Sequence, residues 1–182
     1  SKNDGTLANF VLGYYVRTGQ KCAFHPVTRL DRDTFGIVLL TKNSHIHALM
    51  QQSNLKKTYH ALVSGGPEAE SGIINAPIAR KPLPSLLREV REDGKPCITE
   101  FCVLERCDGY TKLALRPVTG RTHQLRVHCA YMGFPILGDP QYGHGAEDFG
   151  LSHQLLCAKR LEFIHPVTGE TMILESQMDA KI

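Results

Sequence analysis

A charged stretch that leads directly into an aliphatic run constrains this chain more than any other feature. Residues 28–36 read TRLDRDTFG, and residues 37–40 read IVLL. A short aliphatic run that contains β-branched residues and follows a glycine is typical of a buried strand. We therefore expect a strand over about residues 36–41, with a polar loop fixed at its start.

Within this loop, Asp31 stands between Arg29 and Arg32. Nearby positive charge favours the ionised form of a carboxylate. An ionised carboxylate beside a core strand can act as a nucleophile, a base or a metal ligand, and it can equally be half of a structural ion pair. On residue types alone, the structural ion pair is the preferred interpretation.

The composition is that of a folded chain. Its 182 residues are enough for one sizeable domain or two small lobes, and 42% of them are hydrophobic, so the chain can bury a core. The net charge of +3 is compatible with an RNA partner. No apolar run reaches the roughly 18 residues that a membrane span requires, and no signal peptide is visible. We expect a cytoplasmic protein.

The six cysteines are expected to be reduced and mostly buried. There is no Cys-x-x-Cys pair, and a secreted disulfide scaffold is usually shorter and denser in cysteine. No spacing of potential ligands is typical of a metal site, and the glycine-rich loops that bind nucleotides are not found. We therefore expect that the protein uses neither a metal nor a cofactor.

Apolar periodicity and turn residues predict the elements of secondary structure. Helices are expected over residues 7–15, 44–52 and 122–132. Strands are expected over 36–41, 57–64, 99–105, 110–116, 155–164 and 171–174, with a short extended piece over 73–78 and an exposed, basic excursion over 79–96. The pattern predicts an α+β fold in which helices pack on a mixed, mostly antiparallel sheet.

The helix over 122–132 has two distinct faces. One face carries the residues that we expect in the core, Leu125, His128, Cys129 and Met132. Arg126 lies on a different face, with His123 and Ala130. The helix can therefore bury an apolar stripe and still present Arg126 sideways.

Three motifs resemble those of the RluA-type RNA pseudouridine synthases: RLDRDTFG at 29–36, KTYHALVSG at 57–65, and GRTHQLRVH at 120–128 with GFPILGD at 133–139. The resemblance runs from about residue 7 to about residue 175. Thr28 stands where the family usually has His, and Phe35 where it usually has Ser. The family's opening strand, with its Lys-Pro-x-Gly turn, is not found. The resemblance thus implies a pseudouridine synthase catalytic fold that lacks its first strand.

Members of this family are isomerases that convert uridines of rRNA or tRNA to pseudouridine, with the target base flipped out of its stack. The resemblance implies that Asp31 is the catalytic aspartate, that Arg126 pairs with it and that Tyr59 stacks on the uracil. It also implies RNA- or substrate-binding roles for Arg29, Arg32, Arg121 and Leu125. We expect a single catalytic domain over residues 1–182 that acts on RNA as a monomer.

Other interpretations of single residues stay open. Tyr59 could simply be a core residue of its strand. Asp139 is expected to form a turn rather than to be a second catalytic acid. Substrate choice is expected to depend on residues 79–95 and 143–150 and on any further domain.

Two other functions also stay open. The fold could carry a catalytically silent RNA-binding or assembly factor, which the departure at Phe35 and the missing first strand favour. The third possibility is a hydrolase that uses Asp31 with His123 or His128. No nucleophilic Ser or Cys lies in a recognisable elbow, so the residues give this possibility little support.

Overall fold

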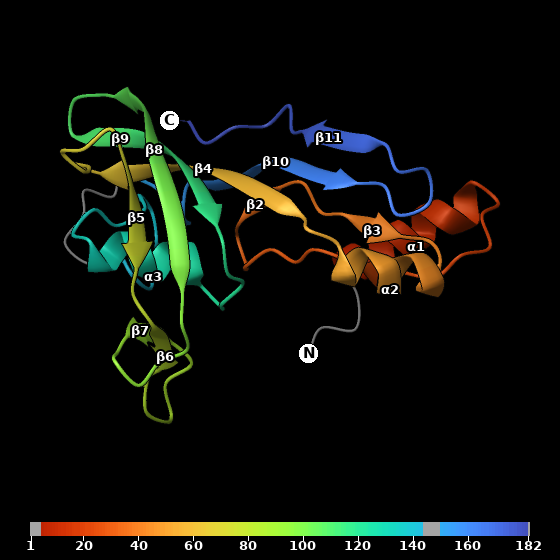
Figure 1. Cartoon of the computed structure of the whole chain (residues 1–182), viewed down its shortest axis with the longest axis horizontal. Helices are drawn as coiled ribbons and strands as arrows, with labels where there is room; N and C mark the ends of the chain where they lie inside the picture. Colours follow the sequence, from red (N-terminus) through yellow and green to blue (C-terminus); the bar gives the residue numbers. More distant parts are fainter. Residues whose placement is uncertain (1–4, 144–149, 182) are drawn as a thin grey trace. The chain divides into compact units, whose positions relative to one another are not determined.

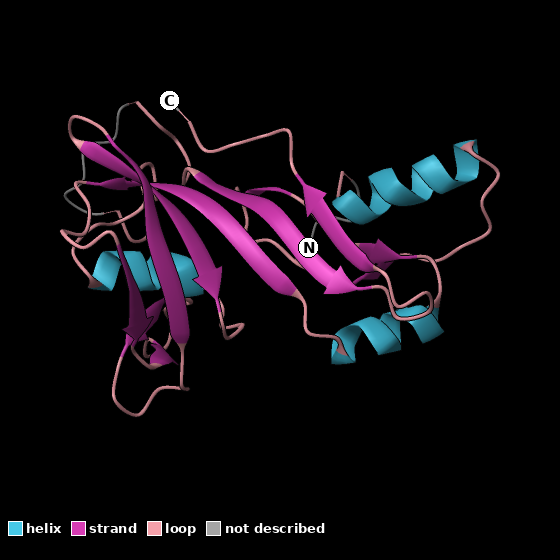
Figure 2. Cartoon of the chain, turned by 45° about the horizontal axis from the view of Figure 1, so that its top comes forward, coloured by secondary structure: helices cyan, strands magenta, loops and turns pink. Residues whose placement is uncertain are grey.

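The computed structural model describes residues 5–143 and 150–181, which contain three helices and eleven strands (Figure 1 and Figure 2). The helices are α1 (Leu7–Arg17), α2 (Ser44–Gln52) and α3 (Gln124–Tyr131). The strands are β1 (His25–Pro26), β2 (Phe35–Gly36), β3 (Leu40–Thr41), β4 (Lys56–Ser64), β5 (Ser71–Asn75), β6 (Ile78–Arg80), β7 (Arg88–Val90), β8 (Ile98–Arg106), β9 (Tyr110–Pro117), β10 (Leu156–Ile164) and β11 (Thr171–Glu175). The predicted α+β class is confirmed.

The chain divides into two compact units. The first combines Ser1–Arg29, Val38–Leu55 and Phe163–Met172, and the second combines Leu30–Ile37, Lys56–Glu162 and Ile173–Ile182. Asp31, Tyr59 and Arg126 all belong to the second unit, which we call the sheet unit. The single catalytic domain over residues 1–182 stays a prediction.

In the first unit, local hydrogen bonds define the starts of both helices. Thr6 forms a capping box with Asn9 at the start of α1, and the Asn43 side chain accepts backbone N–H groups at the start of α2. β1 and β3 pair antiparallel. Thr28, which replaces the usual His, is buried, and its hydroxyl accepts the Leu39 N–H at 2.8 Å. The threonine therefore has a structural role in this unit.

The predicted strand over residues 36–41 is wrong. β2 ends at Gly36, β3 begins at Leu40, and residues 37–40 are only half-buried. β2 pairs in parallel with β10, whereas β3 pairs antiparallel with β1. The aliphatic run therefore connects strands of two different sheets and does not form one continuous strand.

Seven strands form the large sheet, in the order β11-β10-β4-β9-β8-β5, with β2 beside β10. β4 pairs antiparallel with both β9 and β10, and β8 pairs antiparallel with β9 and β5. The predicted hairpin of β8 and β9 turns at Gly109, whose φ of 79° suits glycine. The sheet is thus mixed and mostly antiparallel, as predicted.

The two faces of this sheet bury different clusters. One face packs against α3 (Figure 2). This face buries Ala61, Val63, Leu113, Leu115, Leu125 and Cys129. The opposite face buries Leu62, Leu137, Leu155, Cys157 and Ala180. Because successive residues of a strand point to opposite faces, Tyr59 lies with Ala61 on the α3 face. His128 is also buried, as expected, but Met132 is exposed because α3 ends at Tyr131.

The segment that was expected to be an exposed excursion contains an ordered hairpin. β6 and β7 pair antiparallel over Ile78 to Val90 and lie beyond the ends of β5 and β8 (Figure 1). Ile78 is buried, and Val90 packs against two core clusters. The base of this hairpin is therefore part of the core, and only its tip is exposed.

The remaining expectations concern the cysteines, metal binding, membrane spans and the loop over residues 143–150. All six cysteines are free, but Cys97, Cys129 and Cys157 alone are buried. Among the described residues no cluster of His, Cys, Asp and Glu could hold a metal ion. None of the helices within residues 5–143 and 150–181 has the length and apolar character for crossing a membrane. The glycine-rich loop expected over 143–150 lies, apart from its two ends, outside the described residues.

Gly36 allows β2 to approach β10 closely. Its φ is 110°, and an added Cβ would lie 2.4 Å from the Ala158 carbonyl oxygen. Gly65 provides a comparison, because its φ of 63° is also positive but nothing lies within 4 Å of an added Cβ. Gly36 thus meets two constraints, a positive φ and a backbone contact, whereas Gly65 meets only the first.

We expect Gly36→Ala to lower the free energy of unfolding by about 3 kcal/mol, because the methyl group would separate β2 from β10. Gly65→Ala should cost about 1 kcal/mol, which is the cost of the left-handed backbone alone. Urea denaturation followed by circular dichroism measures both values. Equal losses for the two variants would contradict a close approach of β2 to β10.

Candidate active site

A tight turn places Asp31 at the start of the sheet unit. The Thr34 N–H donates to the Asp31 carbonyl at 3.1 Å, and Asp33 adopts a left-handed φ of 67°. The buried Gln154 amide donates to the Arg32 carbonyl at 2.6 Å and lies 3.1 Å from the Thr34 hydroxyl oxygen. The loop that carries Asp31 is therefore attached to the segment that leads into β10.

Arg126 is positioned by the start of α3. The helix follows His123, which has a left-handed φ of 55° and provides no side-chain cap. Gln124, the first residue of the helix, makes side-chain hydrogen bonds instead: its amide oxygen accepts the N–H of Arg121, which precedes the helix, at 2.9 Å, and its amide nitrogen donates to the Ile98 carbonyl of β8 at 2.8 Å. This buried glutamine therefore fixes the first turn of α3 against the sheet.

The closest partner of Arg126 is Asp139. Nε and Nη2 of Arg126 donate to the two carboxylate oxygens of Asp139 at 2.7 and 2.8 Å, and Nη2 also donates to Gln141 Oε1 at 2.8 Å. The side chains of Arg126 and Asp139 are 4% and 0% exposed. Such a paired, fork-shaped contact fixes the plane of the guanidinium.

Asp139 is also the turn former that the sequence predicted. Its Oδ1 accepts the N–H groups of Gln141 and Tyr142 at 2.9 and 3.1 Å. Burial alone would raise the pKa of Asp139, but the hydrogen bonds from Arg126 and from these two N–H groups outweigh it and hold the pKa below its usual value. Sequence reasoning missed the ion pair, because no local signal links two residues on separate elements.

Asp31 and Arg126 come together, as the resemblance implied, but at longer range. Oδ2 of Asp31 lies 3.9 Å from Nη1 of Arg126, and the Asp31 side chain is 30% exposed. Asp139 and Gln141 occupy Nε and Nη2, so Nη1 is the end of the guanidinium that faces Asp31. The site therefore offers an accessible carboxylate beside a cation that is fixed by other groups.

Tyr142 supports the same arginine from the side. Its ring centre lies 5.0 Å from the guanidinium carbon of Arg126. Its hydroxyl accepts the Arg88 backbone N–H at 3.0 Å and lies 2.8 Å from Nδ1 of His123. Tyr142 thus connects α3, the base of the β6–β7 hairpin and the guanidinium of Arg126. The expected motifs ended at Asp139, and sequence reasoning missed this residue.

His123 is neutral in this arrangement. Burial lowers the pKa of His123, and the positive charges of Arg126 and Arg88 act in the same direction, while the carboxylates of Asp31 and Asp139 oppose them. A neutral imidazole can accept the hydroxyl proton of Tyr142 at Nδ1. The contact is therefore consistent with a neutral histidine that supports the site.

Tyr59 lies near Asp31 on the α3 face of β4 and is half-buried. Burial, and secondly the negative charge of Asp31, raise the pKa of Tyr59 to about 12. The phenol is therefore neutral at physiological pH. It offers an aromatic surface beside the carboxylate rather than a ready phenolate base.

The other predicted binding residues are placed differently. Arg29 belongs to the first unit and is exposed. Arg32 is exposed and lies 3.6 Å from the Asp33 carboxylate. Arg121 is exposed near the start of α3, and its Nε donates to the Pro96 carbonyl at 3.2 Å. Leu125 is 7% exposed and belongs to the core, so its apolar surface is largely used in packing.

His128 has no free ring nitrogen. Nδ1 lies 2.9 Å from the Thr99 hydroxyl, Nε2 lies 2.9 Å from the Ala76 carbonyl oxygen, and the residue is fully buried. Burial lowers the pKa of His128. This histidine cannot serve as the base of the hydrolase alternative, because both nitrogens are engaged inside the core.

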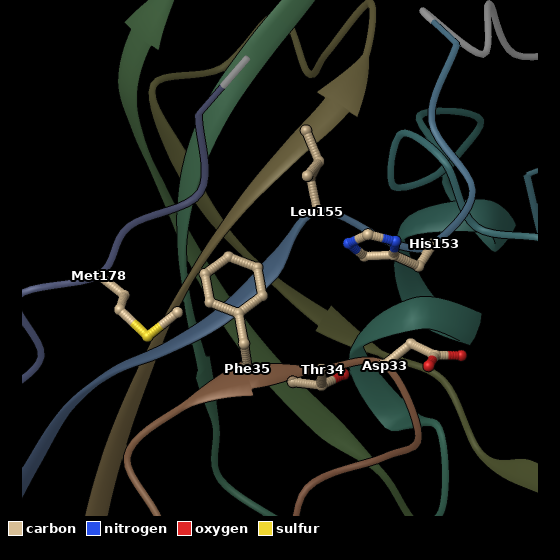
Figure 3. Close-up of a pocket in the computed structure, with 6 residues that line it drawn as sticks. All are labelled: Asp33, Thr34, Phe35, His153, Leu155 and Met178. Atoms are coloured by element: carbon tan, nitrogen blue, oxygen red, sulfur yellow. The ribbon is translucent and has the colours of Figure 1, made fainter.

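A hollow of about 470 Å³ lies beside the Asp31 loop (Figure 3). Phe35, Leu155 and Met178 supply apolar walls, and Asp33 and His153 supply polar groups. Phe35 replaces the usual Ser of the family motif, and it packs partly against the core cluster on the face opposite α3. The substitution therefore adds apolar contact near the loop without occupying the position of Asp31.

Known proteins share both the sequence and the fold. A model of the family described as RNA pseudouridylate synthase matches residues 2–131. The chain is 40% identical over 172 residues to the Bacillus subtilis protein named "Uncharacterized RNA pseudouridine synthase YjbO", covering 92% of this chain and 60% of that protein. It is 38% identical over 165 residues to the "Ribosomal large subunit pseudouridine synthase C" of Vibrio cholerae, covering 86% and 52%.

A solved structure agrees with these relatives. "Human RNA Pseudouridylate Synthase Domain Containing 1" superposes with a TM-score of 0.78 at 26% identity, covering 93% of this chain and 74% of that one. The chain belongs to the RNA pseudouridylate synthase family, which confirms the resemblance of its RluA-type motifs. It spans 60% and 52% of the length of the two curated relatives.

The two aspartates that face Arg126 should differ in their effect on stability. Asp139→Asn removes the charge that compensates a buried guanidinium, and we expect a loss of about 3 kcal/mol in the free energy of unfolding. Asp31 is partly exposed, and its Oδ2 lies 3.9 Å from Nη1 of Arg126. Asp31→Asn should therefore lower the free energy of unfolding by less than about 1 kcal/mol. Chemical denaturation of both variants tests this difference. A larger loss for Asp31→Asn would contradict the assignment of Asp139 as the main partner.

Acid should destabilise the fold through His128. In the unfolded chain His128 takes up a proton near pH 6.5, whereas burial lowers its pKa in the folded state. The unfolded state therefore binds more protons below about pH 6.5, and the stability present above that pH is lost as the pH falls. The limiting slope is about 1.4 kcal/mol per pH unit for each such histidine. His128→Gln should flatten the dependence of stability on pH between 7 and 5. A slope unchanged in His128→Gln would contradict this.

Proposed function

We propose that this protein is an RNA pseudouridine synthase whose catalytic carboxylate is Asp31. The observation that carries the proposal is the meeting of three groups in one site: an accessible carboxylate at Asp31, the fixed guanidinium of Arg126 3.9 Å away, and the neutral phenol of Tyr59. Family membership supports the same reaction. The reaction is an isomerisation and needs no oxidant, reductant or second substrate.

The bonds of this reaction balance within one nucleotide. The bond between uracil N1 and ribose C1′ breaks, the free base turns, and a new bond joins C5 to C1′. The proton on C5 leaves, and N1 gains a proton. The target base must leave its stack before any of this occurs, because neither C1′ nor C5 is accessible to a side chain inside a helix.

Each of the three groups has a proposed task. Asp31 supplies the carboxylate that acts at the sugar or the base. Arg126 supports this charge, and it can do so without reorganising because Asp139 and Gln141 already fix its plane. Tyr59 provides the surface on which the flipped uracil stacks. Its raised pKa favours stacking and hydrogen bonding over proton removal by a phenolate.

We propose uridines of large-subunit ribosomal RNA as the substrate class. The support is the name of the Vibrio cholerae relative, together with the exposed cations Arg32 and Arg121 in the sheet unit. A tRNA substrate stays the second possibility that the motifs allowed. The monomeric state and the cytoplasmic location stay predictions from the sequence.

Asp31→Asn should abolish pseudouridine formation, by about a thousandfold or more, while folding and RNA binding remain. Asp33→Asn is the matched control, because it makes the same chemical change two residues away and asparagine tolerates the left-handed backbone there. Single-turnover assays on RNA from a strain without the gene, with carbodiimide labelling and primer extension, measure the product. Activity retained in Asp31→Asn would reject the proposed catalytic carboxylate.

The same labelling on total RNA identifies the substrate. A pseudouridine that disappears when the gene is deleted, returns with the wild-type gene and does not return with Asp31→Asn would establish both the reaction and its site. If rRNA and tRNA keep every pseudouridine under several growth conditions, the protein is a binding or assembly factor and the enzymatic proposal fails.

A further inference from the structure

A short segment that follows β11 lies on the face of the large sheet opposite α3. We call this segment, residues 176–180, the strap. The Ser176 N–H donates to the Lys159 carbonyl of β10 at 2.9 Å, and Nζ of Lys159 donates to the carbonyls of Ser176 and Met178 at 2.7 and 3.2 Å. Ala180 is fully buried in the core cluster of that face. The strap is therefore fixed to the sheet although it forms no helix or strand.

One carboxylate of the strap is bound to two strands of the sheet. Oδ1 of Asp179 lies 2.7 Å from Nδ1 of His60 in β4, and Oδ2 accepts Nζ of Lys112 in β9 at 2.8 Å. The three side chains are 27%, 18% and 19% exposed. Burial alone would raise the pKa of Asp179, but the hydrogen bonds from Lys112 and His60 outweigh it and hold the pKa below its usual value. Asp179 is therefore an ionised anchor with charge-assisted hydrogen bonds.

The strap meets the segment that carries Asp31 through the side chain of Phe35. Met178 and Phe35 line the same hollow (Figure 3), and Phe35 packs against the cluster that contains Ala180. β2 consists of Phe35 and Gly36 alone, so the strand after the Asp31 loop is paired with β10 over only two residues. With so short a strand, the packing of the Phe35 ring helps to determine where the loop lies.

The candidate active site is sensitive to the position of this loop. Oδ2 of Asp31 lies 3.9 Å from Nη1 of Arg126. The guanidinium is fixed by Asp139 and cannot follow a displaced carboxylate. A displacement of about 1 Å at a reacting group can lower a rate by about a hundredfold. A group that fixes the loop from behind can therefore affect the reaction without contacting the substrate.

We propose that Asp179 is a positioning residue for Asp31. Asp179 holds the strap on the sheet, and the strap supports the ring of Phe35. The ring in turn keeps the Asp31 loop at its distance from Arg126. The hollow between Met178 and Phe35 leaves room for the ring to move once the strap is released. The inference rests on the proposed function of Asp31, and it gives a role to the phenylalanine that stands where the family usually has Ser.

The first test is Asp179→Asn, which keeps the shape of the side chain and removes the charge that Lys112 pairs with. On RNA from a strain without the gene, the maximal single-turnover rate should fall by about tenfold. The half-saturating protein concentration should stay within about twofold, because the strap lies on the face opposite α3. Asp108→Asn, at an exposed position in the β8–β9 turn, should change neither quantity. Rates are referred to the folded fraction, which circular dichroism measures at the assay temperature.

A double-mutant cycle tests whether Asp179 acts through Phe35. Phe35→Ser should lower the maximal rate by a similar factor, because it removes the ring that the strap supports. In the Phe35→Ser background, Asp179→Asn should lower the rate by less than about twofold further. A full tenfold loss in both backgrounds would show that Asp179 does not act through Phe35 and would overturn the proposal.

Crystal structures of the wild-type protein and of Asp179→Asn measure the positioning directly. Oδ2 of Asp31 should lie farther from Nη1 of Arg126 in the variant than in the wild type. An unchanged distance, or a wild-type rate in Asp179→Asn, would overturn the positioning role. The distance tests this role even if the wild-type protein makes no pseudouridine in any RNA, an outcome that would reject the proposed function alone.

Discussion

The buried ion pair between Arg126 and Asp139 is the interaction on which the site depends. Two charges removed from water are costly unless further hydrogen bonds satisfy them, and here Gln141 and the turn N–H groups do so. Arg126 comes from α3 and Asp139 from the loop that follows it, so the pair fixes the distance between these two segments. The result is a guanidinium with a single orientation and one end, Nη1, directed at Asp31.

The position of Asp31 depends on different interactions. Its loop is held by the Gln154 amide and by the close approach of Gly36 to β10. The carboxylate and the arginine are therefore positioned by two separate sets of groups within the sheet unit. This division allows Asp31 to stay accessible, because neither set uses its side chain as a structural partner.

The sequence predicted the long, regular elements well, since periodicity over nine residues, as in β4 and α2, reflects local burial. The predicted strand over residues 36–41 was wrong at residues 37–39, because an aliphatic run gives no indication that its two ends pair with strands of different sheets. The motifs identified Asp31, Tyr59 and Arg126 together. They could not reveal Asp139 as the partner of Arg126 or Tyr142 as its support, because these contacts depend on how α3 and the following loop return to the sheet.

The charge of the site bears on how the proposed substrate could approach it. With Asp31 as a carboxylate, two negative groups face one guanidinium, while the lowered pKa of His123 and the raised pKa of Tyr59 keep both residues neutral. The cluster thus carries about one net negative charge and would by itself repel a polyanion. The proposed RNA substrate would therefore need cations outside the cluster, and Arg32 and Arg121 are exposed in the sheet unit. Under the proposed function, the residues that serve the chemistry and those that attract RNA are different ones.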